Sequence, residues 1–308
     1  MRRRATACAA VIALLLGAGA AAPAVADAPT QAPDIDVNAV VGHLEELQSV
    51  AEANGGNRAA GEPGYDASVD YVVEQLENAG YTVERQKCPD CTGQQENVIA
   101  QTDTADSEQV VMLGGHLDGV VSGAGINDNG SGSAALLEIA LTLAEQNPEL
   151  AKNVRFAWWA AEETGLEGSS YYVQELAPAE QDRIEVYLNF DMLGSPNAGY
   201  FVYEGEATAA GLFHESLAGA GVEAENIDLT GSSDHTAFER AGVPVGGLFT
   251  GAGSTKTAEQ AEKWGGTAGE AFDSCYHRSC DDMGNIDETA LDRMTDTAAF
   301  ATWSLAAG

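Results

Sequence analysis

The chain has 308 residues and carries 14 Lys and Arg against 48 Asp and Glu, a formal net charge of −34. A surface this acidic repels nucleic acid and anionic lipid, so we expect no nucleic-acid partner and no membrane partner. A chain of this length can bury a sizeable hydrophobic core, so any disulfides are supplementary to the fold.

The N-terminal segment, residues 1–26, is predicted to be a cleaved signal peptide. Arginines at 2–4 precede an apolar run over 9–22, and residues 24–26 (AVA) fit the small-x-small cleavage pattern. The alternative is a membrane anchor, which needs about 20 apolar residues, more than this run supplies. We therefore expect a secreted protein whose mature part, residues 27–308, forms one domain.

The cysteines indicate an oxidising environment. Five are present, and Cys8 lies in the predicted leader. The other four are an even number in an exported chain, and their simplest pairing joins Cys88 to Cys91 and Cys275 to Cys280. A redox-active pair or half of a zinc site are alternatives for Cys88 and Cys91. No second CxxC motif completes a four-thiolate site, so a structural bridge is favoured.

Helical and strand-like segments alternate along the chain. After an N-terminal arm over 27–37, two helices are predicted over 40–53 and 65–78, with glycine just beyond each. The segments that follow are strands over 81–87, 97–101 and 109–113, a helix over 131–145, a strand over 154–160, a helix over 168–176, strands over 186–193 and 245–249, and a final helix over 287–306.

This alternation predicts the fold class. Strands alternating with helices favour a single-domain, three-layer α/β/α sandwich with a mixed, largely parallel central sheet. In such sheets ligands bind just beyond the carboxyl ends of the strands. Reactive side chains at those ends are therefore the first evidence to seek for a function.

Imidazole and carboxylate side chains follow three successive buried strands. The strand at 109–113 is followed by His116 and Asp118. The next buried strand is followed by Glu162 and Glu163, and the one after it contains Asp191 close to its end. Acidic residues are abundant in this chain, but a set in which each group ends a different apolar strand is not expected by chance.

Two further side chains complete a metal-ligand set. Asp128 lies in a glycine-rich loop, and His277 lies between two cysteines. The whole set supplies enough ligands for two adjacent metal ions, and zinc accepts both nitrogen and carboxylate oxygen. Cobalt or manganese can use the same ligands. The remaining histidines are expected in surface, packing or helix-capping positions: His43, His214 and His235.

The paired glutamates are expected to have different roles. Side chains of neighbouring residues point apart on an extended segment, so Glu162 and Glu163 cannot easily ligate one ion. One is expected to bind metal and the other to move a proton. Asp118 lies two residues after His116, so its side chain is expected to return to the same side and hold the second imidazole nitrogen.

The stretches that carry these residues resemble the secreted Streptomyces-type leucine aminopeptidases. That group belongs to a zinc-peptidase superfamily that also contains Vibrio-type aminopeptidases and glutaminyl cyclases. The similarity covers about 110–282 and extends more weakly to both ends of the mature chain. The matching stretches are GGHLDGV, GAGINDNGSGSA, FAWWAAEETGLEGSSYYV, LNFDMLGSPN, SDHTAF, PVGGLFTGAG and CYHRSCDD.

The resemblance implies an extracellular aminopeptidase that hydrolyses the N-terminal peptide bond of peptides with a free N-terminus, using a water activated by two zinc ions. It implies that Glu162 is the general base and that Tyr276 stabilises the tetrahedral intermediate. We expect the enzyme to be a monomer. The zinc ligands it implies are His116 and Asp191 on one ion, Glu163 and His277 on the other, and Asp128 between them.

The resemblance also implies a specificity pocket. Met192, Gly231 and Phe249 match positions that line the pocket for the first side chain, and their character favours large apolar residues such as leucine. Ser232 departs from the family pattern, because close relatives usually have an arginine that lines the substrate pocket there. This departure bears on specificity and on stabilisation of the substrate carbonyl.

A second metal site is implied by Asp34, Ile35, Asp292 and Asp296, which match a calcium site in close relatives. Asp292 and Asp296 are one helical turn apart and share a helix face, and calcium prefers oxygen ligands. A solvated acidic face is the alternative. The rival functions are a one-zinc glutaminyl cyclase, a carboxypeptidase or dipeptidase, and a receptor-like domain without catalysis, against which the full ligand set argues.

Overall fold

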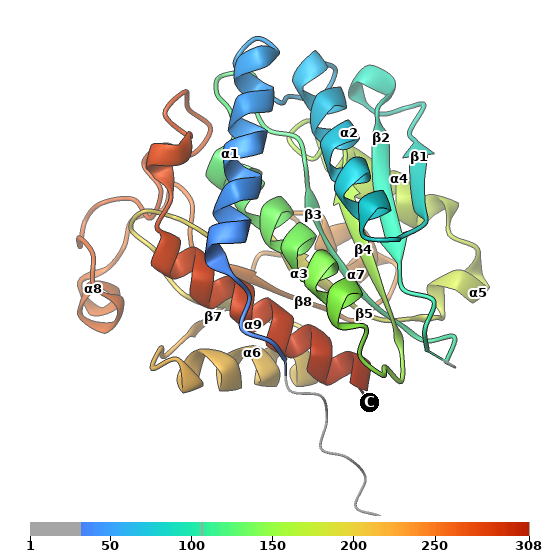
Figure 1. Cartoon of the computed structure of the whole chain (residues 1–308). Helices are drawn as coiled ribbons and strands as arrows, with labels where there is room; N and C mark the ends of the chain where they lie inside the picture. The colour runs from blue at the N-terminus through green and yellow to red at the C-terminus, as the bar shows by residue number, and fades with distance from the viewer. Residues whose placement is uncertain (1–31, 106, 308) are drawn as a thin grey trace, which may run out of the picture.

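A computed structural model describes residues 32–105 and 107–307, and the predicted leader lies outside them. These residues form one eight-stranded sheet with helices on both faces (Figure 1). The strands are β1 (Val83–Lys87), β2 (Glu96–Gln101), β3 (Val110–His116), β4 (Asn153–Trp159), β5 (Ile184–Phe190), β6 (Phe201–Tyr203), β7 (Glu225–Ile227) and β8 (Val245–Phe249).

The helices include every one that the sequence predicted, together with four others in the second half of the described chain. They are α1 (Val37–Ala53), α2 (Pro63–Asn78), α3 (Gly132–Gln146), α4 (Glu167–Glu175), α5 (Pro178–Gln181), α6 (Ala207–Gly219), α7 (His235–Arg240), α8 (Ala258–Trp264) and α9 (Glu288–Ala307). Single helical turns are η1 (Thr92–Gln94), η2 (Ile126–Ser131) and η3 (Met283–Asn285).

The sheet has a parallel centre and mixed edges. Its strand order is β1-β2-β4-β3-β5-β8-β6-β7, in which β4, β3, β5 and β8 are parallel to one another. At one edge β2 and β1 are antiparallel additions, and at the other β6 runs antiparallel to β8 and parallel to β7. The predicted three-layer sandwich with a mixed, largely parallel sheet is confirmed.

Alternate strand residues enter two separate hydrophobic cores, as expected for a sheet covered on both faces. Val111 and Leu113 of β3 belong to the larger core, which the long helices α1, α2, α3, α6 and α9 cover. Their neighbours Val110 and Met112 belong to a smaller core on the other face, where Tyr172 of α4 packs. The central strands are therefore buried on both sides and hold their ends rigidly.

Element boundaries differ from prediction where polar contacts set them. Helix α1 begins at Val37, three residues before the predicted start, because the Asp36 carboxylate accepts a hydrogen bond from the Asn38 amide and caps the helix. Strand β3 continues past its apolar run through two glycines to His116, which pairs with Trp159 of β4. His116 therefore lies on a strand of the sheet.

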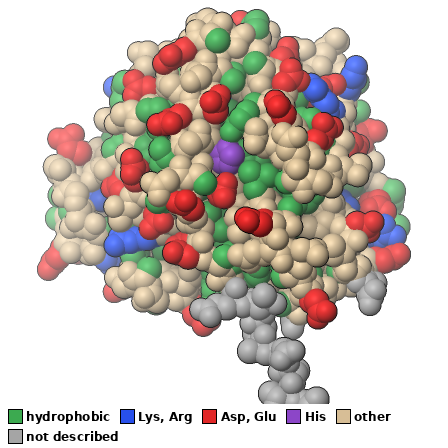
Figure 2. Space-filling view, viewed as in Figure 1, with side chains coloured by type: hydrophobic (Ala, Val, Ile, Leu, Met, Phe, Trp, Pro, Cys, Tyr) green, Lys and Arg blue, Asp and Glu red, His purple; other side chains and the backbone are tan. Residues whose placement is uncertain are grey.

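Acidic side chains are spread over the face shown in Figure 2, where basic ones are few. The excess of negative charge is therefore a property of the folded surface as well as of the composition.

None of the helices in the described ranges combines the length and the apolar content needed to cross a bilayer.

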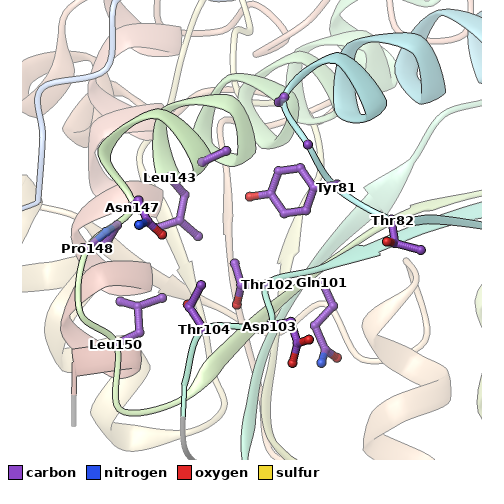
Figure 3. Close-up of a pocket in the computed structure, with 13 residues that line it drawn as sticks. Tyr81, Thr82, Gln101, Thr102, Asp103, Thr104, Leu143, Asn147, Pro148 and Leu150 are labelled. Atoms are coloured by element: carbon purple, nitrogen blue, oxygen red, sulfur yellow. The ribbon is translucent and has the colours of Figure 1, made fainter.

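A cavity of about 500 Å³ lies away from the predicted catalytic residues (Figure 3). Its lining includes Tyr81 after α2, the stretch 101–104 after β2 and Asn147 after α3. Because β2 runs antiparallel to β4, this end of β2 lies at the amino ends of the parallel strands. The described residues that line this cavity include no histidine or cysteine.

Candidate active site

Three neighbouring parallel strands bring the predicted residues to one edge of the sheet. His116 is the last residue of β3, Asp191 directly follows β5, and Glu162 and Glu163 follow β4 in a turn. The carboxyl ends of β4, β3 and β5 adjoin because these strands are parallel neighbours. A cavity of about 280 Å³ opens there, and its lining includes His116, Asp128, Glu162, Asp191, Tyr276 and His277.

The Asp128 carboxylate lies between two imidazoles. Its Oδ1 is 3.4 Å from Nε2 of His116, which is also 3.5 Å from Oδ1 of Asp191. Its Oδ2 is 3.1 Å from Nε2 of His277, which is also 3.0 Å from Oε2 of Glu163. The two oxygens of one carboxylate thus each face a different imidazole and a different second carboxylate.

Several buried oxygens in this cluster lack a hydrogen-bonding partner among the described residues. They are Oδ2 of Asp128, Oε1 of Glu163 and Oδ1 of Asp191. Burying an unpaired carboxylate oxygen is costly unless the group is paired or coordinates a metal. Ligand atoms of His116, Asp128 and Glu163 lie within 4.8 Å of one another. Imidazole nitrogen and carboxylate oxygen in this arrangement fit zinc.

The electrostatics of the cluster also favour a cation. The close carboxylates of Asp128 and then Glu163 raise the pKa of His277 to about 10. Burial lowers the pKa of His116, but the charges of Glu162 and Asp191 outweigh it and leave this pKa well above its usual range. A metal ion would compete with a proton for the same imidazole nitrogen, so both shifts reflect how strongly the carboxylates attract positive charge.

Asp118 supports the turn that carries the paired glutamates. Its Oδ1 accepts a hydrogen bond from the Glu162 amide at 3.0 Å, and its Oδ2 accepts one from the Glu163 amide at 3.3 Å. Nδ1 of His116 lies 3.0 Å from the Asp118 backbone oxygen and 3.7 Å from its carboxylate. Asp118 therefore contacts both the imidazole, mainly through its backbone, and the glutamate turn, through its side chain.

Glu162 lies beside the metal-ligand cluster. Its Oε2 is 4.0 Å from Nε2 of His116. Burial raises the pKa of Glu162 well above its usual range, and the carboxylates of Asp234 and Asp191 raise it further. Burial and neighbouring charges of this kind are how proteins adjust a carboxyl group for proton transfer.

Left-handed backbone occurs at three non-glycine residues of the site. Ala161 has φ 54°, Met192 has φ 55° and His277 has φ 58°. Each such conformation costs roughly 1–3 kcal/mol and persists only where the surrounding structure enforces it. These residues flank Glu162, Asp191 and the loop around His277, so the strained backbone coincides with the segments that carry the reactive side chains.

The Asp128 loop is fastened by a residue that the sequence analysis did not single out. Asp281 accepts hydrogen bonds from the backbone amides of Asn127 at 2.8 Å and Asp128 at 3.0 Å, and from the Asn285 side chain at 3.0 Å. Burial raises the pKa of Asp281 to about 7. Because it follows Cys280 directly, Asp281 links the Asp128 loop to the segment that carries His277.

Arg58 is a second buried group that the sequence analysis missed. Its guanidinium donates to the backbone oxygens of Leu117, Ala124 at 2.9 Å and Gly125 at 2.6 Å. Its side chain is fully buried, and burial lowers its pKa to about 10. Arg58 therefore holds the loop between His116 and Asp128 in shape. No local pattern reveals this role, because the acceptors are backbone oxygens about 60 residues away.

The apolar wall of the cavity includes two of the residues predicted for it, Met192 and Phe249, and two that were not predicted, Ile227 and Leu229. Ile227 ends β7, a short edge strand that the sequence analysis did not identify as a separate element. Gly231 is not among the lining residues. It lies in an exposed turn, with open space where a Cβ would stand.

Polar residues form another part of the same cavity. The Ser232 hydroxyl donates to the Leu229 backbone oxygen at 2.6 Å, and the Ser233 hydroxyl donates to Oδ2 of Asp191 at 2.7 Å. The ring of Tyr276 stacks on that of His277 with centroids 3.8 Å apart. Both Ser232 and Tyr276 line the cavity, as the resemblance implied for a pocket that contacts substrate.

Comparison with known proteins agrees with this geometry. The model of peptidase family M28 matches residues 97–302, which carry all the residues of the metal-ligand cluster. The chain belongs to peptidase family M28. The resemblance to the zinc-peptidase superfamily is thereby confirmed.

Curated relatives of this M28 peptidase are longer than the chain. This chain is 53% identical over 290 residues to leupeptin-inactivating enzyme 1 of Streptomyces exfoliatus, and the match covers 94% of this chain and 66% of that protein. It is 49% identical over 218 residues to an aminopeptidase of Pseudomonas aeruginosa, covering 67% of this chain and 40% of that protein. The chain thus spans between two fifths and about two thirds of these relatives.

Solved structures share the fold. The aminopeptidase from Aneurinibacillus sp. strain AM-1 superposes with a TM-score of 0.72 at 18% identity, covering 88% of this chain and 94% of that one. BSAP, a zinc aminopeptidase from Bacillus subtilis, superposes with a TM-score of 0.59 at 27% identity, covering 70% of this chain and 51% of that one. The M28 architecture therefore extends over most of the described residues.

Both predicted disulfides are present in this M28 peptidase. Cys88 is bonded to Cys91, and Cys275 is bonded to Cys280. The second bridge closes the loop that carries Tyr276. The first lies beside the turn that carries the paired glutamates, although the two segments are some 70 residues apart in sequence.

The residues predicted for calcium lie together. The Ile35 amide donates to Oδ1 of Asp296 at 2.8 Å. Burial raises the pKa of Asp296 to about 6, and the adjacent carboxylates of Asp34 and Asp292 add to the shift. Three carboxylates that repel one another are consistent with a cation site and also with an acidic face, so calcium stays a prediction.

The other three histidines have protein partners. Nε2 of His43 lies 3.1 Å from Glu138, and Nε2 of His214 lies 2.7 Å from the side-chain oxygen of Asn226. The ring of His235, at the start of α7, packs on that of Tyr203 with centroids 4.9 Å apart. None of the three belongs to the metal-ligand cluster.

Proposed function

We propose that this chain is an aminopeptidase that holds two zinc ions and removes single residues from the N-termini of peptides. The observation that carries the proposal is the placement of Asp128, whose two oxygens face His116 on one side and His277 on the other. A carboxylate in that position can bridge two metal ions. Family membership and the named aminopeptidases among the relatives support the same reading.

His116 and Asp191 are the proposed ligands of one zinc, Glu163 and His277 those of the other, with Asp128 shared. Two bound zinc ions would polarise the scissile carbonyl and lower the pKa of the attacking water. Each ion would have few protein ligands, as a catalytic site requires. The unpartnered oxygens of Asp128, Glu163 and Asp191 support this assignment.

The free α-amine of the substrate is proposed to bind beside Glu162 and Asp191. Both carboxylates border the cavity, and an ammonium group complements their charge. An N-acetylated peptide has no such charge, so it leaves the two carboxylates without a partner. Dependence on this contact makes the enzyme an exopeptidase acting at the N-terminus.

Glu162 is the proposed general base. Its carboxylate takes a proton from the attacking water as the new carbon–oxygen bond forms. It then returns that proton to the leaving nitrogen as the peptide carbon–nitrogen bond breaks. The Tyr276 hydroxyl, on the same cavity wall, is proposed to donate a hydrogen bond to the developing oxyanion. Asp118 keeps the Glu162 amide, and with it the turn, in place.

A preference for large apolar N-terminal residues such as leucine is proposed from the cavity wall. Met192, Phe249, Ile227 and Leu229 present apolar surface there, and the cavity volume of about 280 Å³ accommodates a branched aliphatic side chain. Ser232 contributes a small neutral side chain to this cavity where close relatives usually have an arginine, and this departure bears on specificity and on stabilisation of the substrate carbonyl.

The remaining assignments are also proposals. Residues 27–308 are proposed to act as one zinc-peptidase domain, as a monomer outside the cell, and to bind calcium at Asp34, Ile35, Asp292 and Asp296. The two disulfides support an oxidising compartment, because such bonds persist outside the cytosol. The three adjacent carboxylates support the calcium assignment.

Hydrolysis of leucine p-nitroanilide beside its N-acetylated form tests the activity. We expect cleavage of the free-amine substrate alone, loss of cleavage with a chelator and recovery with zinc. Metal analysis is expected to find two zinc ions per chain. Cyclisation of an N-terminal glutamine peptide with one zinc per chain would instead establish the glutaminyl cyclase alternative, and cleavage of the acetylated substrate would contradict an exopeptidase.

A further inference from the structure

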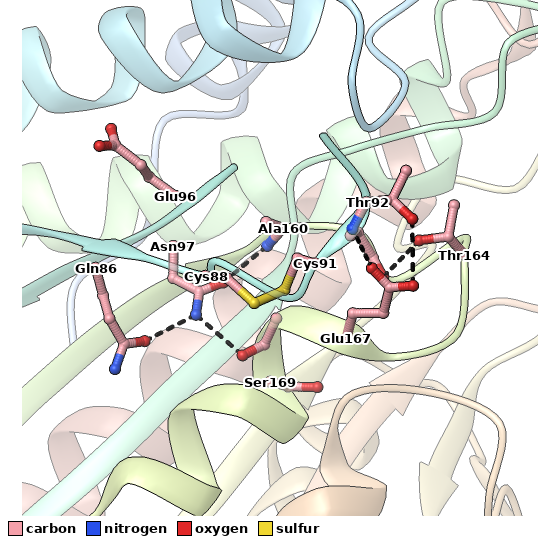
Figure 4. The surroundings of a disulfide bond; sticks show 12 residues. Gln86, Cys88, Cys91, Thr92, Glu96, Asn97, Ala160, Thr164, Glu167 and Ser169 are labelled. Atoms are coloured by element: carbon pink, nitrogen blue, oxygen red, sulfur yellow. Dashed lines mark hydrogen bonds between the residues drawn. A yellow bond between two sulfur atoms is a disulfide. The ribbon is translucent and has the colours of Figure 1, made fainter. Parts of the chain in front are cut away.

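The turn that carries Glu162 and Glu163 is held from two opposite sides. We call residues 161–167 the glutamate turn. On one side the Asp118 carboxylate accepts both glutamate amides. On the other side Asn97 of β2 closes the neck of the turn. Its Oδ1 accepts from the Ala160 amide at 3.0 Å, and its Nδ2 donates to the Gly168 oxygen at 2.9 Å (Figure 4).

The loop closed by the Cys88–Cys91 disulfide provides a second contact on that side. The backbone amide of Thr92 donates to Oε2 of Glu167 at 2.5 Å, and its hydroxyl donates to Oε1 at 3.2 Å. Figure 4 shows the disulfide beside this pair of hydrogen bonds. Thr92 directly follows Cys91, so the bridge limits how far this amide can move relative to Cys88.

Hydrogen bonds within the turn connect this contact to the proposed base. The Glu167 amide donates to the Ala161 backbone oxygen at 3.0 Å. The amides of Gly165 and Leu166 both donate to the Glu162 backbone oxygen, at 2.9 and 2.8 Å. A displacement of Glu167 therefore shifts the backbone of Glu162. The tip of the turn, Thr164 and Gly165, is exposed, and its hydrogen bonds run back into the turn: the Thr164 hydroxyl donates to the Ala161 oxygen at 3.2 Å.

Close packing limits the freedom of the supporting segments. A Cβ at Gly168 would lie 2.3 Å from the Ala160 oxygen and 2.4 Å from Oδ1 of Asn97. A Cβ at Gly93, two residues after Cys91, would lie 2.4 Å from the Cα of Gly61. The segment after the disulfide thus rests on the Gly61 backbone, and the neck of the turn rests on the Ala160 backbone and the Asn97 side chain, with no space for a Cβ at either glycine.

We propose that two supports together position the proposed catalytic base: the Cys88–Cys91 loop, acting through the Thr92–Glu167 contact, and Asn97, acting through its hydrogen bonds to Ala160 and Gly168. Thr92 and Asn97 contact the turn and Glu167 belongs to it, and none of the three lines the cavity, so they are positioning residues. The proposal rests on the role assigned above to Glu162. A general base displaced by a fraction of an ångström from its proton loses much of its effect, so turnover depends on how well this turn is held.

Substitution of Glu167 separates positioning from stability. Glu167→Ala removes both contacts with Thr92 and is expected to lower kcat about 10-fold with KM unchanged. Glu167→Gln keeps an acceptor for the Thr92 amide, while its NH₂ group can donate to the Thr92 hydroxyl, so we expect it to restore most of the turnover. Glu175→Ala is the matched control, since Glu175 is an exposed glutamate at the other end of α4.

The double variant Cys88→Ala with Cys91→Ala tests the loop itself. We expect a fall in kcat in the same direction as in Glu167→Ala. Adding Glu167→Ala to this variant is expected to cause little further loss, because both changes act through one contact and coupled sites are not additive. Full additivity would show that the disulfide loop and Glu167 act independently, which overturns the proposal.

Hydrogen–deuterium exchange of the segment 160–168 in each full-length variant provides a readout that does not depend on activity. We expect faster exchange in Glu167→Ala, and rates like those of the unmodified protein in Glu167→Gln and Glu175→Ala. A lower thermal midpoint for Glu167→Ala with unchanged kcat and unchanged exchange would show a purely structural role. If the unmodified protein cleaves no free-amine substrate, the proposed function fails, while exchange still decides whether Thr92 and Glu167 hold the turn.

Discussion

The two halves of the proposed metal site are built in different ways. His116 belongs to a central strand and its side chain is 1% exposed, whereas His277 lies on a disulfide-closed loop and its side chain is 41% exposed. Asp191 follows a central strand directly, whereas Glu163 lies in the glutamate turn. The sheet fixes the first half, and loops must fix the second.

The exposed half is held by contacts that the strands do not supply. The Ser122 hydroxyl donates to the His277 backbone oxygen at 2.9 Å, and the Cys275–Cys280 bridge closes its loop. Asp118 and the Thr92–Glu167 contact hold the turn with Glu163. The comparison indicates that perturbing a strand should damage the fold and the site together, whereas perturbing a loop should damage the site alone.

The largest effect is expected from Glu162, which lies beside both halves. Glu162→Gln removes the proton acceptor without removing a proposed ligand, so kcat should fall about 10²–10⁴-fold. Zinc content, measured by elemental analysis, should remain that of the unmodified protein. Turnover close to normal in this variant would exclude Glu162 as the base, and loss of zinc would place it among the ligands.

Removing one imidazole at a time compares the halves directly. His277→Ala should leave about one zinc per chain and nearly the normal thermal midpoint, because the side chain is partly exposed. Its turnover should fall by more than the roughly 10–100-fold typical of losing a group that merely orients a ligand. His116→Ala should also lower the midpoint, because it leaves buried carboxylates unpaired and a cavity in the sheet. Equal midpoints for the two variants would contradict the difference in construction.

A smaller, pH-dependent effect is expected at the carboxylates of Asp34, Asp292 and Asp296, where no imidazole balances the charge. The pKa of Asp296 is raised from 3.8 to about 6, so the folded protein binds more protons than the unfolded chain between those values. The contribution of Asp296 to the free energy of unfolding therefore falls as pH rises through this window.

Asp296→Asn removes that pH dependence and keeps an acceptor for the Ile35 amide. In calcium-free buffer the thermal midpoint of the variant, relative to the unmodified protein, should rise by roughly 2–4 °C from pH 4 to pH 7, after allowing for solvent screening at a half-exposed group. Added calcium should stabilise only the unmodified protein. If the difference in thermal midpoint between the variant and the unmodified protein did not change with pH, the surroundings of Asp296 would not be raising its pKa.

The composition of each segment predicted the centre of the fold better than its edges. The apolar runs that became β3, β4 and β5 are long enough to be identified without tertiary information. Strands β6 and β7 have three residues each and were not identified, because so short a run carries no periodic signal. The antiparallel direction of β2 was equally hidden, since pairing direction depends on which strand lies beside it.

The sequence by itself determined which reactive side chains end the central strands and which cysteines pair, because strand ends and short loop closures are local properties of the chain. Only the tertiary structure decided how those side chains are held. The hydrogen bonds that hold them join segments far apart in sequence, and they are made by Asp281, Arg58, Asn97 and Glu167. A buried polar group takes whichever partner the packing brings near, and that choice is made when the layers assemble.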